Sequence, residues 1–265
     1  MKAIFFDLDD TLLWDEKSVE ESFQATCQLA YDKYGVDVVG FEKAVKEEAK
    51  KLYMSYETYS YVKMIGINPF EALWSHFSDP KDENLKKLQE LAPTYRKDAW
   101  NNGLKAVGIN DQPFAKELSE QFGQERRKRP YVYDDTFEVL DELKGHVELL
   151  LLTNGDPSLQ KEKIESIPSL ASYFKHIIIS GEFGKGKPST EIFQHALHLM
   201  GVTEDEVMMV GDKLSTDILG ANKTKIPSVW LNRKGVSPYM DVHPTYEVQN
   251  LKELVTLVKE SKVSR

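Results

Sequence analysis

Acidic and hydroxyl side chains stand directly after three short apolar runs of the sequence. These junctions are Asp7-Leu8-Asp9-Asp10-Thr11-Leu12, Thr153-Asn154-Gly155-Asp156, and Gly211-Asp212 with Asp217 five residues later. In an open parallel sheet, ligands bind outside the carboxyl ends of the strands. If the three apolar runs are strands of one such sheet, these polar groups meet at one edge.

Three carboxylates at one point, those of Asp7, Asp9 and Asp212, would repel one another strongly unless a cation lies among them. Oxygen ligands without nearby His or Cys favour a hard ion, and Mg²⁺ fits best because it completes its shell with water and substrate phosphate. Lys187, in the glycine-rich loop Gly184-Lys185-Gly186-Lys187-Pro188, adds a positive charge. The backbone N–H groups after Asp7 and Thr153 can bind an oxyanion. Such a site suits transfer of a phosphoryl group, which depends on positioning and charge stabilisation.

Two of the carboxylates are candidates for the chemical steps themselves. Asp7 can act as a nucleophile, because carboxylates form aspartyl-phosphate intermediates. Asp9 lies two residues further on, where a turn can aim it at the leaving oxygen. A general acid at that place would protonate the departing alcohol and later activate water against the acyl phosphate.

The elements that position these residues are short strands separated by helical patterns. The expected strands are Ala3–Leu8, Val147–Leu152, Ile177–Ser180, Val207–Val210 and Ser228–Leu231. Buried apolar runs that alternate with helices are typical of a parallel sheet covered on both faces, so the predicted fold class is a doubly wound, Rossmann-like α/β core.

The stretch between the first and second strands has a different composition. It is rich in Glu, Lys, Leu, Ala and aromatic residues, and Val19, Phe23, Thr26, Cys27 and Ala30 repeat at helical spacing. A second helical pattern is expected to break at Pro93. The predicted organisation is a catalytic core of residues 1–14 and 131–265 with a helical domain, residues 15–130, inserted after the first strand.

Composition limits the classes of function. The net charge of −9 speaks against general affinity for nucleic-acid polymers or anionic membranes, and the single cysteine, Cys27, excludes an internal disulfide. No apolar run approaches the roughly 20 residues of a membrane helix. Met1-Lys2-Ala3 leads straight into the first apolar run, so a cytoplasmic protein is expected. A monomer or a weak homodimer needs no special assumption.

These three junctions and the loop that contains Lys187 together resemble the four motifs of the haloacid dehalogenase-like (HAD) superfamily. The residues that carry the resemblance are Asp7-Leu8-Asp9-Asp10-Thr11-Leu12, Thr153-Asn154-Gly155, Lys187-Pro188 and Gly211-Asp212 with Asp217. The helical insertion is similar to the C1-type cap of that superfamily. Within it, the chain looks closest to bacterial phosphatases of the pyrimidine 5′-nucleotidase and N-acylneuraminate-9-phosphatase type.

This resemblance implies a role for each matching residue. Asp7 would be the nucleophile and Asp9 the general acid/base, while Thr153, Asn154 and Lys187 would bind the substrate phosphate. Mg²⁺ would be bound by Asp7, the backbone carbonyl of Asp9, and Asp212. Asp217 would be either a direct ligand or an outer-shell residue, and these two roles stay open.

The predicted function is therefore Mg²⁺-dependent hydrolysis of a small phosphorylated metabolite, a nucleoside monophosphate or sugar phosphate, through an aspartyl-phosphate. A carboxylate at Asp9 favours phosphate-ester chemistry, because dehalogenases of the superfamily lack one there. A phosphosugar mutase with the same core and a non-catalytic phosphate-binding protein are the alternatives. The sequence does not indicate the physiological substrate or the cap residues that select it.

Several other residues have a functional and a structural interpretation. His195 and His198 are spaced like a metal pair on a helix, but no third ligand is near in sequence, so surface histidines are expected. Arg126-Arg127-Lys128-Arg129 is expected to be a solvated segment where the cap returns to the core. Four tyrosines, Tyr53, Tyr56, Tyr59 and Tyr61, fit ordinary packing better than a ligand pocket, although both remain open.

Overall fold

The computed structural model describes residues 1–263, and the chain divides into two compact units. One unit consists of Met1–Trp14, Val132–Gly155 and the described chain from Lys163 onward; the other consists of Asp15–Tyr131 and Asp156–Glu162. Tyr131 and the segment Asp156–Glu162, which the prediction assigns to the core, group with the helical unit. Within the described residues, no helix is both long enough and apolar enough to cross a membrane.

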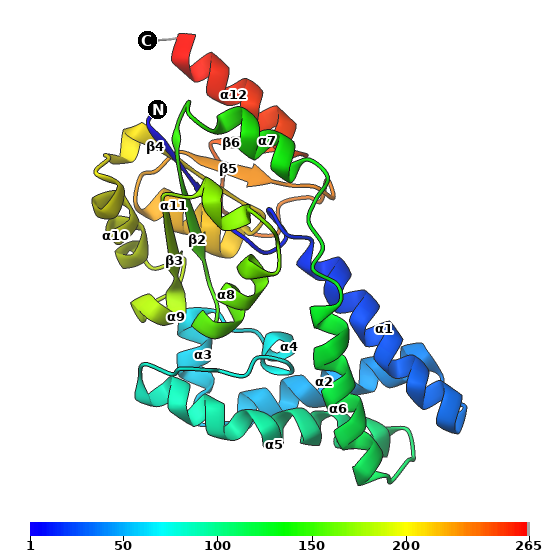
Figure 1. Ribbon diagram of the computed structural model, residues 1–265. Coiled ribbons are helices and arrows are strands. Elements are labelled where there is room, and N and C mark those ends of the chain that lie inside the picture. The colour runs from blue at the N-terminus through cyan, green and yellow to red at the C-terminus, as the bar shows by residue number, and fades with distance from the viewer. Residues whose placement is uncertain (264–265) are drawn as a thin grey trace. The chain divides into compact units, whose positions relative to one another are not determined.

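The core unit is built on a six-stranded sheet with the order β3-β2-β1-β4-β5-β6, in which every neighbouring pair is parallel (Figure 1). The strands are β1 (Ala3–Phe6), β2 (Glu148–Thr153), β3 (His176–Ile179), β4 (Val207–Gly211), β5 (Ser228–Leu231) and β6 (Tyr246–Val248). The doubly wound α/β prediction is confirmed. From β1 the chain runs outward through β2 to β3, and it then crosses back to β4 on the other side of β1. This change of direction creates the switch point at which ligands bind in such sheets.

Helices cover both faces of this sheet because alternate strand residues point to opposite sides. Ile4 and Phe6 pack on one face with α7 (Thr136–Leu143) and α12 (Leu251–Val263), whereas Ala3 and Phe5 pack on the other with α10 (Thr190–Met200) and α11 (Leu219–Lys223). The shorter elements of this unit are η1 (Leu170–Tyr173), α9 (Ser180–Phe183), η2 (Glu204–Glu206) and the π-helical turn η3 (Leu214–Ile218).

The helical unit contains α1 (Asp15–Tyr34), α2 (Val38–Ser55), α3 (Tyr59–Ile65), α4 (Pro69–Ala72), α5 (Glu83–Ala106) and α6 (Gln112–Arg127). Its core is aromatic: Phe23 of α1 lies 6.0 Å from Trp100 and 4.5 Å from Phe122, centroid to centroid. Phe23, Thr26, Cys27 and Ala30 are buried along one face of α1, as their spacing predicts. Helix α8 (Pro157–Glu165) contributes its first residues to this unit and Lys163 to the core unit.

The expected helix break at Pro93 is wrong, since α5 continues through this residue. A proline inside a helix costs about 3 kcal/mol because it removes one hydrogen bond. Packing offsets this cost: Ala92, Tyr95 and Trp100 are all buried in the core of the helical unit. Gly103 permits a close approach of α5 to α2, because a Cβ there would lie 2.4 Å from Val45 Cγ2.

Candidate active site

The central strands bring two of the predicted site residues to one edge of the sheet. Phe6, the last residue of β1, pairs with Leu151 of β2 and Val210 of β4. Asp7 follows directly, and its backbone N–H donates to Val210 O at 2.9 Å. Asp212 follows the end of β4 in the same way. The register of the parallel strands therefore places these carboxylates together, as the strand-end argument predicts.

A buried lysine links two carboxylates at this edge. Lys187 Nζ lies 2.6 Å from Asp7 Oδ1 and 2.6 Å from Asp217 Oδ1, and the Lys187 residue is only 4% exposed. Burial by itself would lower the pKa of Lys187, but the charges of Asp217 and Asp7 raise it above its ordinary value. Burial raises the pKa of Asp7, against the opposing effect of Lys187. The lysine is thus a fixed positive charge beside the predicted nucleophile.

Asp7, Asp212 and Asp217 form a group with the geometry of a metal site. Each offers a carboxylate oxygen, and these oxygens lie within 4.8 Å of one another. Asp212 Oδ1 is buried and has no hydrogen-bond partner among residues 1–263. Burial, together with the charges of Asp7 and Asp217, raises the pKa of Asp212 well above its ordinary value, although Lys213 opposes the rise. An all-oxygen donor set with an unsatisfied buried oxygen fits Mg²⁺.

Asp217 is held by the turn that follows β4. It is fully buried in η3, and its Oδ2 accepts a hydrogen bond from the backbone N–H of Lys213 at 3.0 Å. Gly211 makes room for it, because a Cβ at that position would lie 2.4 Å from Asp217 Cγ. The glycine before Asp212 therefore serves the packing of Asp217, which the sequence alone does not indicate.

Asp9 has a different environment from the other three carboxylates. Its two oxygens accept hydrogen bonds from Lys163 Nζ at 3.0 and 3.1 Å, and the Lys163 side chain is 5% exposed. Sequence reasoning missed Lys163. Its only signal is a lysine ten residues after Thr153 in the helix following β2, and that spacing does not indicate a partner in another loop.

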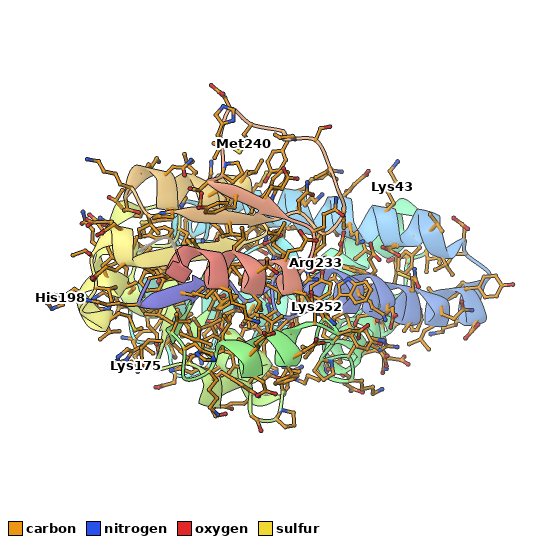
Figure 2. All side chains as sticks on the ribbon, turned by 90° about the horizontal axis from the view of Figure 1, so that it is seen from above. Lys43, Lys175, His198, Arg233, Met240 and Lys252 are labelled. Atoms are coloured by element: carbon orange, nitrogen blue, oxygen red, sulfur yellow. The ribbon has the colours of Figure 1, made fainter. Side chains whose placement is uncertain are left out.

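The loop after Asp9 is fixed by Arg233, which Figure 2 labels. Its guanidinium donates to the backbone oxygen of Thr11 at 3.1 Å and to both oxygens of Asp135, at 2.9 and 3.1 Å. It also lies 3.7 Å from the centroid of the Tyr133 ring. These contacts hold the loop that carries the predicted acid/base at a defined place in the core unit.

Asn154 is bonded to the loop that presents Lys187. Its Nδ2 donates to Lys187 O at 2.9 Å, and its Oδ1 accepts from Lys187 N at 2.8 Å. Gly186 is needed beside it, because a Cβ there would lie 2.9 Å from Asn154 Oδ1. Thr153, at the end of β2, is buried. Its binding of phosphate, like that of Asn154, stays a prediction.

The remaining sequence candidates lie elsewhere. Lys185 is exposed and forms an ion pair with Glu191, so Lys187 and not Lys185 reaches Asp7. His195 and His198 are exposed on α10, and Figure 2 shows His198 at the outside of the molecule. The expected solvation of Arg126 is wrong: the residue is 3% exposed because it pairs with Asp15 at the start of α1.

Comparison with known proteins gives matches over nearly the whole chain. A family model described as haloacid dehalogenase-like hydrolase matches residues 1–223. The chain is 36% identical to a phosphoserine phosphatase of Thermus thermophilus, over 96% of this chain and 98% of the relative. It is 30% identical to the N-acylneuraminate-9-phosphatase of Mus musculus, over 98% of this chain and 94% of the relative.

Solved structures agree with the fold. The HAD-hydrolase YfnB from Bacillus subtilis, described as bound to magnesium, superimposes with a TM-score of 0.65 at 19% identity, covering 97% of this chain and 98% of that one. At this identity the likeness establishes the fold alone.

Proposed function

Because this chain belongs to the haloacid dehalogenase-like hydrolases, we propose that it is a Mg²⁺-dependent phosphatase that hydrolyses a small phosphorylated metabolite through an aspartyl-phosphate on Asp7. Its relatives named as phosphatases support phosphomonoester hydrolysis as the reaction. The contact of Lys187 Nζ with Asp7 at 2.6 Å carries the residue assignment. The Asp212 oxygen without a hydrogen bond from the described residues, which belongs to the same group of carboxylates, supports it.

In the first step, a carboxylate oxygen of Asp7 attacks phosphorus and the bond from phosphorus to the ester oxygen breaks. Protonated Asp9 gives its proton to that oxygen, so the product leaves as an alcohol. Lys187 stabilises the negative charge on the transferring group. Because Asn154 binds both backbone groups of Lys187, it keeps the ammonium beside Asp7.

In the second step, the Asp9 carboxylate accepts a proton from water while the water oxygen attacks phosphorus. The bond between phosphorus and the Asp7 oxygen breaks, which releases inorganic phosphate and restores both carboxyl groups to their starting states. Asp7, the backbone carbonyl of Asp9, and Asp212 would hold Mg²⁺, with Asp217 as a direct or outer-shell ligand. The ion supplies charge neutralisation for the phosphoryl oxygens and for the clustered carboxylates.

The test is phosphate release from p-nitrophenyl phosphate and from a panel of nucleoside monophosphates, sugar phosphates and N-acylneuraminate 9-phosphate. Wild type is compared with Asp7→Asn, in Mg²⁺ and in EDTA. Asp134→Asn is the matched control, because Asp134 is an exposed carboxylate. We expect turnover that needs Mg²⁺, that Asp7→Asn abolishes and that Asp134→Asn retains.

Two results would overturn the proposal. Folded wild-type protein that binds Mg²⁺ but releases no phosphate from any panel member would indicate a phosphate-binding protein. Isomerised sugar phosphate instead of free phosphate would indicate a mutase.

A further inference from the structure

Tyrosine side chains at the junction of α2 and α3 differ in what their hydroxyl groups contact. Tyr53, near the end of α2, donates to Ile67 O at 2.8 Å, and Tyr61 donates to Asp82 Oδ2 at 2.6 Å. Tyr59, the first residue of α3, packs its ring edge-on against Tyr53, with 6.3 Å between the centroids. Its hydroxyl makes no hydrogen bond to any of residues 1–263. This hydroxyl is left available to solvent or to a ligand.

Tyr53 and Tyr59 line a hollow in the surface of the helical unit. Its volume is about 320 Å³, and its other lining residues are Lys50, Met54, Lys63, Ile67 and Pro69. All of them belong to the helical unit. The volume falls in the range of about 300–1,000 Å³ that is usual for small-molecule sites, which are mostly apolar with a few polar groups. The hollow has the size and the lining of a ligand site.

The spacing of the lining residues along two helices explains why the hollow forms. Lys50, Tyr53 and Met54 are spaced at i, i+3 and i+4 in the last turns of α2, so they share one face of that helix. Tyr59 and Lys63 are four residues apart and share one face of α3. The hydrogen bond of the Tyr53 hydroxyl ties α2 to the chain that follows α3. The two helix faces are thereby held together around the hollow.

The charged groups at the hollow are both positive. Lys50 and Lys63 are exposed, and neither forms an ion pair with a carboxylate of residues 1–263. By contrast, Lys46 and Lys51 of α2 each pair with a glutamate of the same helix, at 2.5 and 2.6 Å. None of the described residues that line the hollow carries a carboxylate. Apolar surface beside two unpaired cations complements a ligand with an apolar body and a negative charge.

We propose that this hollow binds a small organic anion with an apolar body. The body lies against the tyrosine rings and Met54, and the anionic group faces Lys50 and Lys63. The Tyr59 hydroxyl donates a hydrogen bond to the anionic group. An inorganic anion lacks the apolar contact and a neutral apolar compound lacks the charge contact, so each binds more weakly. The site is formed by the helical unit alone and does not depend on the proposed phosphatase function.

The test is a titration with three probes, followed by methyl NMR of protein that carries ¹³C-labelled methionine. The probes are naphthalene-2-sulfonate, the uncharged naphthalene-2-sulfonamide, and methanesulfonate, which has the charge without the apolar body. We expect naphthalene-2-sulfonate to bind most tightly and to bind more weakly as NaCl is raised, because salt screens exposed charges. The methyl signal of Met54, identified from its loss in Met54→Leu, should shift during the titration. That of Met200, on α10 of the core unit, should not.

Substitutions separate the two parts of the site. Lys50→Gln/Lys63→Gln should raise the Kd of naphthalene-2-sulfonate about 3- to 30-fold, as loss of two exposed charge contacts predicts, and leave that of the sulfonamide unchanged. Tyr59→Phe keeps the ring and should raise the Kd of the sulfonate about 2- to 10-fold. Circular dichroism establishes that each variant is folded.

Lys43→Gln is the matched control for the lysine variants. Lys43 is an exposed lysine of the same helix, does not line the hollow, and lies at the outside of the molecule in Figure 2. Like Lys50 and Lys63, it forms no ion pair with a carboxylate in the described part of the chain. Its Kd for naphthalene-2-sulfonate should equal that of wild type.

Three results would overturn this inference. The first is a sulfonate that binds no better than the sulfonamide, and the second is a sulfonate Kd that Lys50→Gln/Lys63→Gln leaves unchanged. The third is a Met54 signal that moves with protein concentration alone, which would show that a second copy of the chain covers the hollow. None of these measurements needs turnover, so phosphate release and this site are decided separately.

Discussion

Substitution of Gly211 by alanine tests whether Asp217 is required for metal binding. The added Cβ would lie 2.4 Å from Asp217 Cγ, which is about 1 Å closer than ordinary van der Waals contact. Gly211 is the last residue of the central strand β4 and is paired with Trp230 of β5, so the backbone cannot easily withdraw. The Asp217 carboxylate must therefore move away from Lys187 and from the backbone N–H of Lys213.

The magnitude follows from these contacts. Overpacking a rigid site costs about 1–3 kcal/mol of unfolding free energy. Misplacing a residue that ligates or orients a metal ion ordinarily costs about 10- to 100-fold in metal affinity or activity. We therefore expect Gly211→Ala to lower Tm by several degrees and to raise the Mg²⁺ concentration for half-maximal phosphatase activity about 10- to 100-fold.

Thermal unfolding and Mg²⁺ titration of phosphate release measure the two effects separately. Gly220→Ala is the control, because its Cβ would lie 2.2 Å from Phe193 Cε2 in the apolar core. That variant should lose stability without a change in Mg²⁺ dependence. If Gly211→Ala, assayed where it is folded, keeps the wild-type Mg²⁺ dependence and kcat, the assigned role of Asp217 is refuted.

Three further substitutions test other contacts. Lys163→Met removes the hydrogen bonds that Lys163 Nζ donates to the Asp9 carboxylate. Its kcat should therefore fall roughly tenfold more on alkyl phosphates than on p-nitrophenyl phosphate, whose leaving group needs no proton. Lys163→Arg should retain activity, and an equal fall on both substrates would argue against a role of Lys163 in positioning Asp9. Asn154→Ala removes two hydrogen bonds to Lys187, and we expect urea unfolding to show a loss of about 1–3 kcal/mol and steady-state kinetics a lower kcat/KM. Burial would raise the pKa of Glu125, but hydrogen bonds from its basic neighbours lower it from 4.5 to about 2. Ionised Glu125 therefore stabilises the fold at pH values above its unfolded pKa, and this stabilisation is lost as the pH falls toward 2. The Tm of Glu125→Gln should fall less between about pH 6 and pH 3 than the Tm of wild type. Equal falls in Tm would contradict this expectation.

Much of the core unit could be predicted from the sequence, because its strands are short apolar runs bounded by polar turns. Strand β6 was not predicted, since it has three residues and two of them, Tyr246 and Glu247, are exposed. The continuation of α5 through Pro93 was not predicted either. Both depend on tertiary packing, which overrides local preference, and local preference is all that a single sequence shows directly.

The same distinction between local sequence pattern and tertiary packing applies to the residues of the candidate site. Asp7, Thr153 and Asp212 could be predicted because each stands at or directly after a strand end, and parallel strands bring those ends together. The pairing of Asp9 with Lys163 could not, because the two residues are 154 positions apart and no local pattern connects them. The space that Gly211 leaves for Asp217 is likewise a property of the folded chain.

The arrangement of charges is unfavourable for stability, which supports the proposed functional role of these residues. Carboxylate oxygens within 4.8 Å of one another repel by at least about 3 kcal/mol per pair at an effective dielectric constant near 20. Lys187 offsets part of this through its contacts with Asp7 and Asp217, but Asp212 Oδ1 is left without a hydrogen bond from any described residue. A protein selected for stability alone would replace such a carboxylate with a neutral side chain. The cluster would become favourable on binding a cation, so the same repulsion that destabilises the free site would provide the driving force for the proposed binding of Mg²⁺ beside the proposed nucleophile.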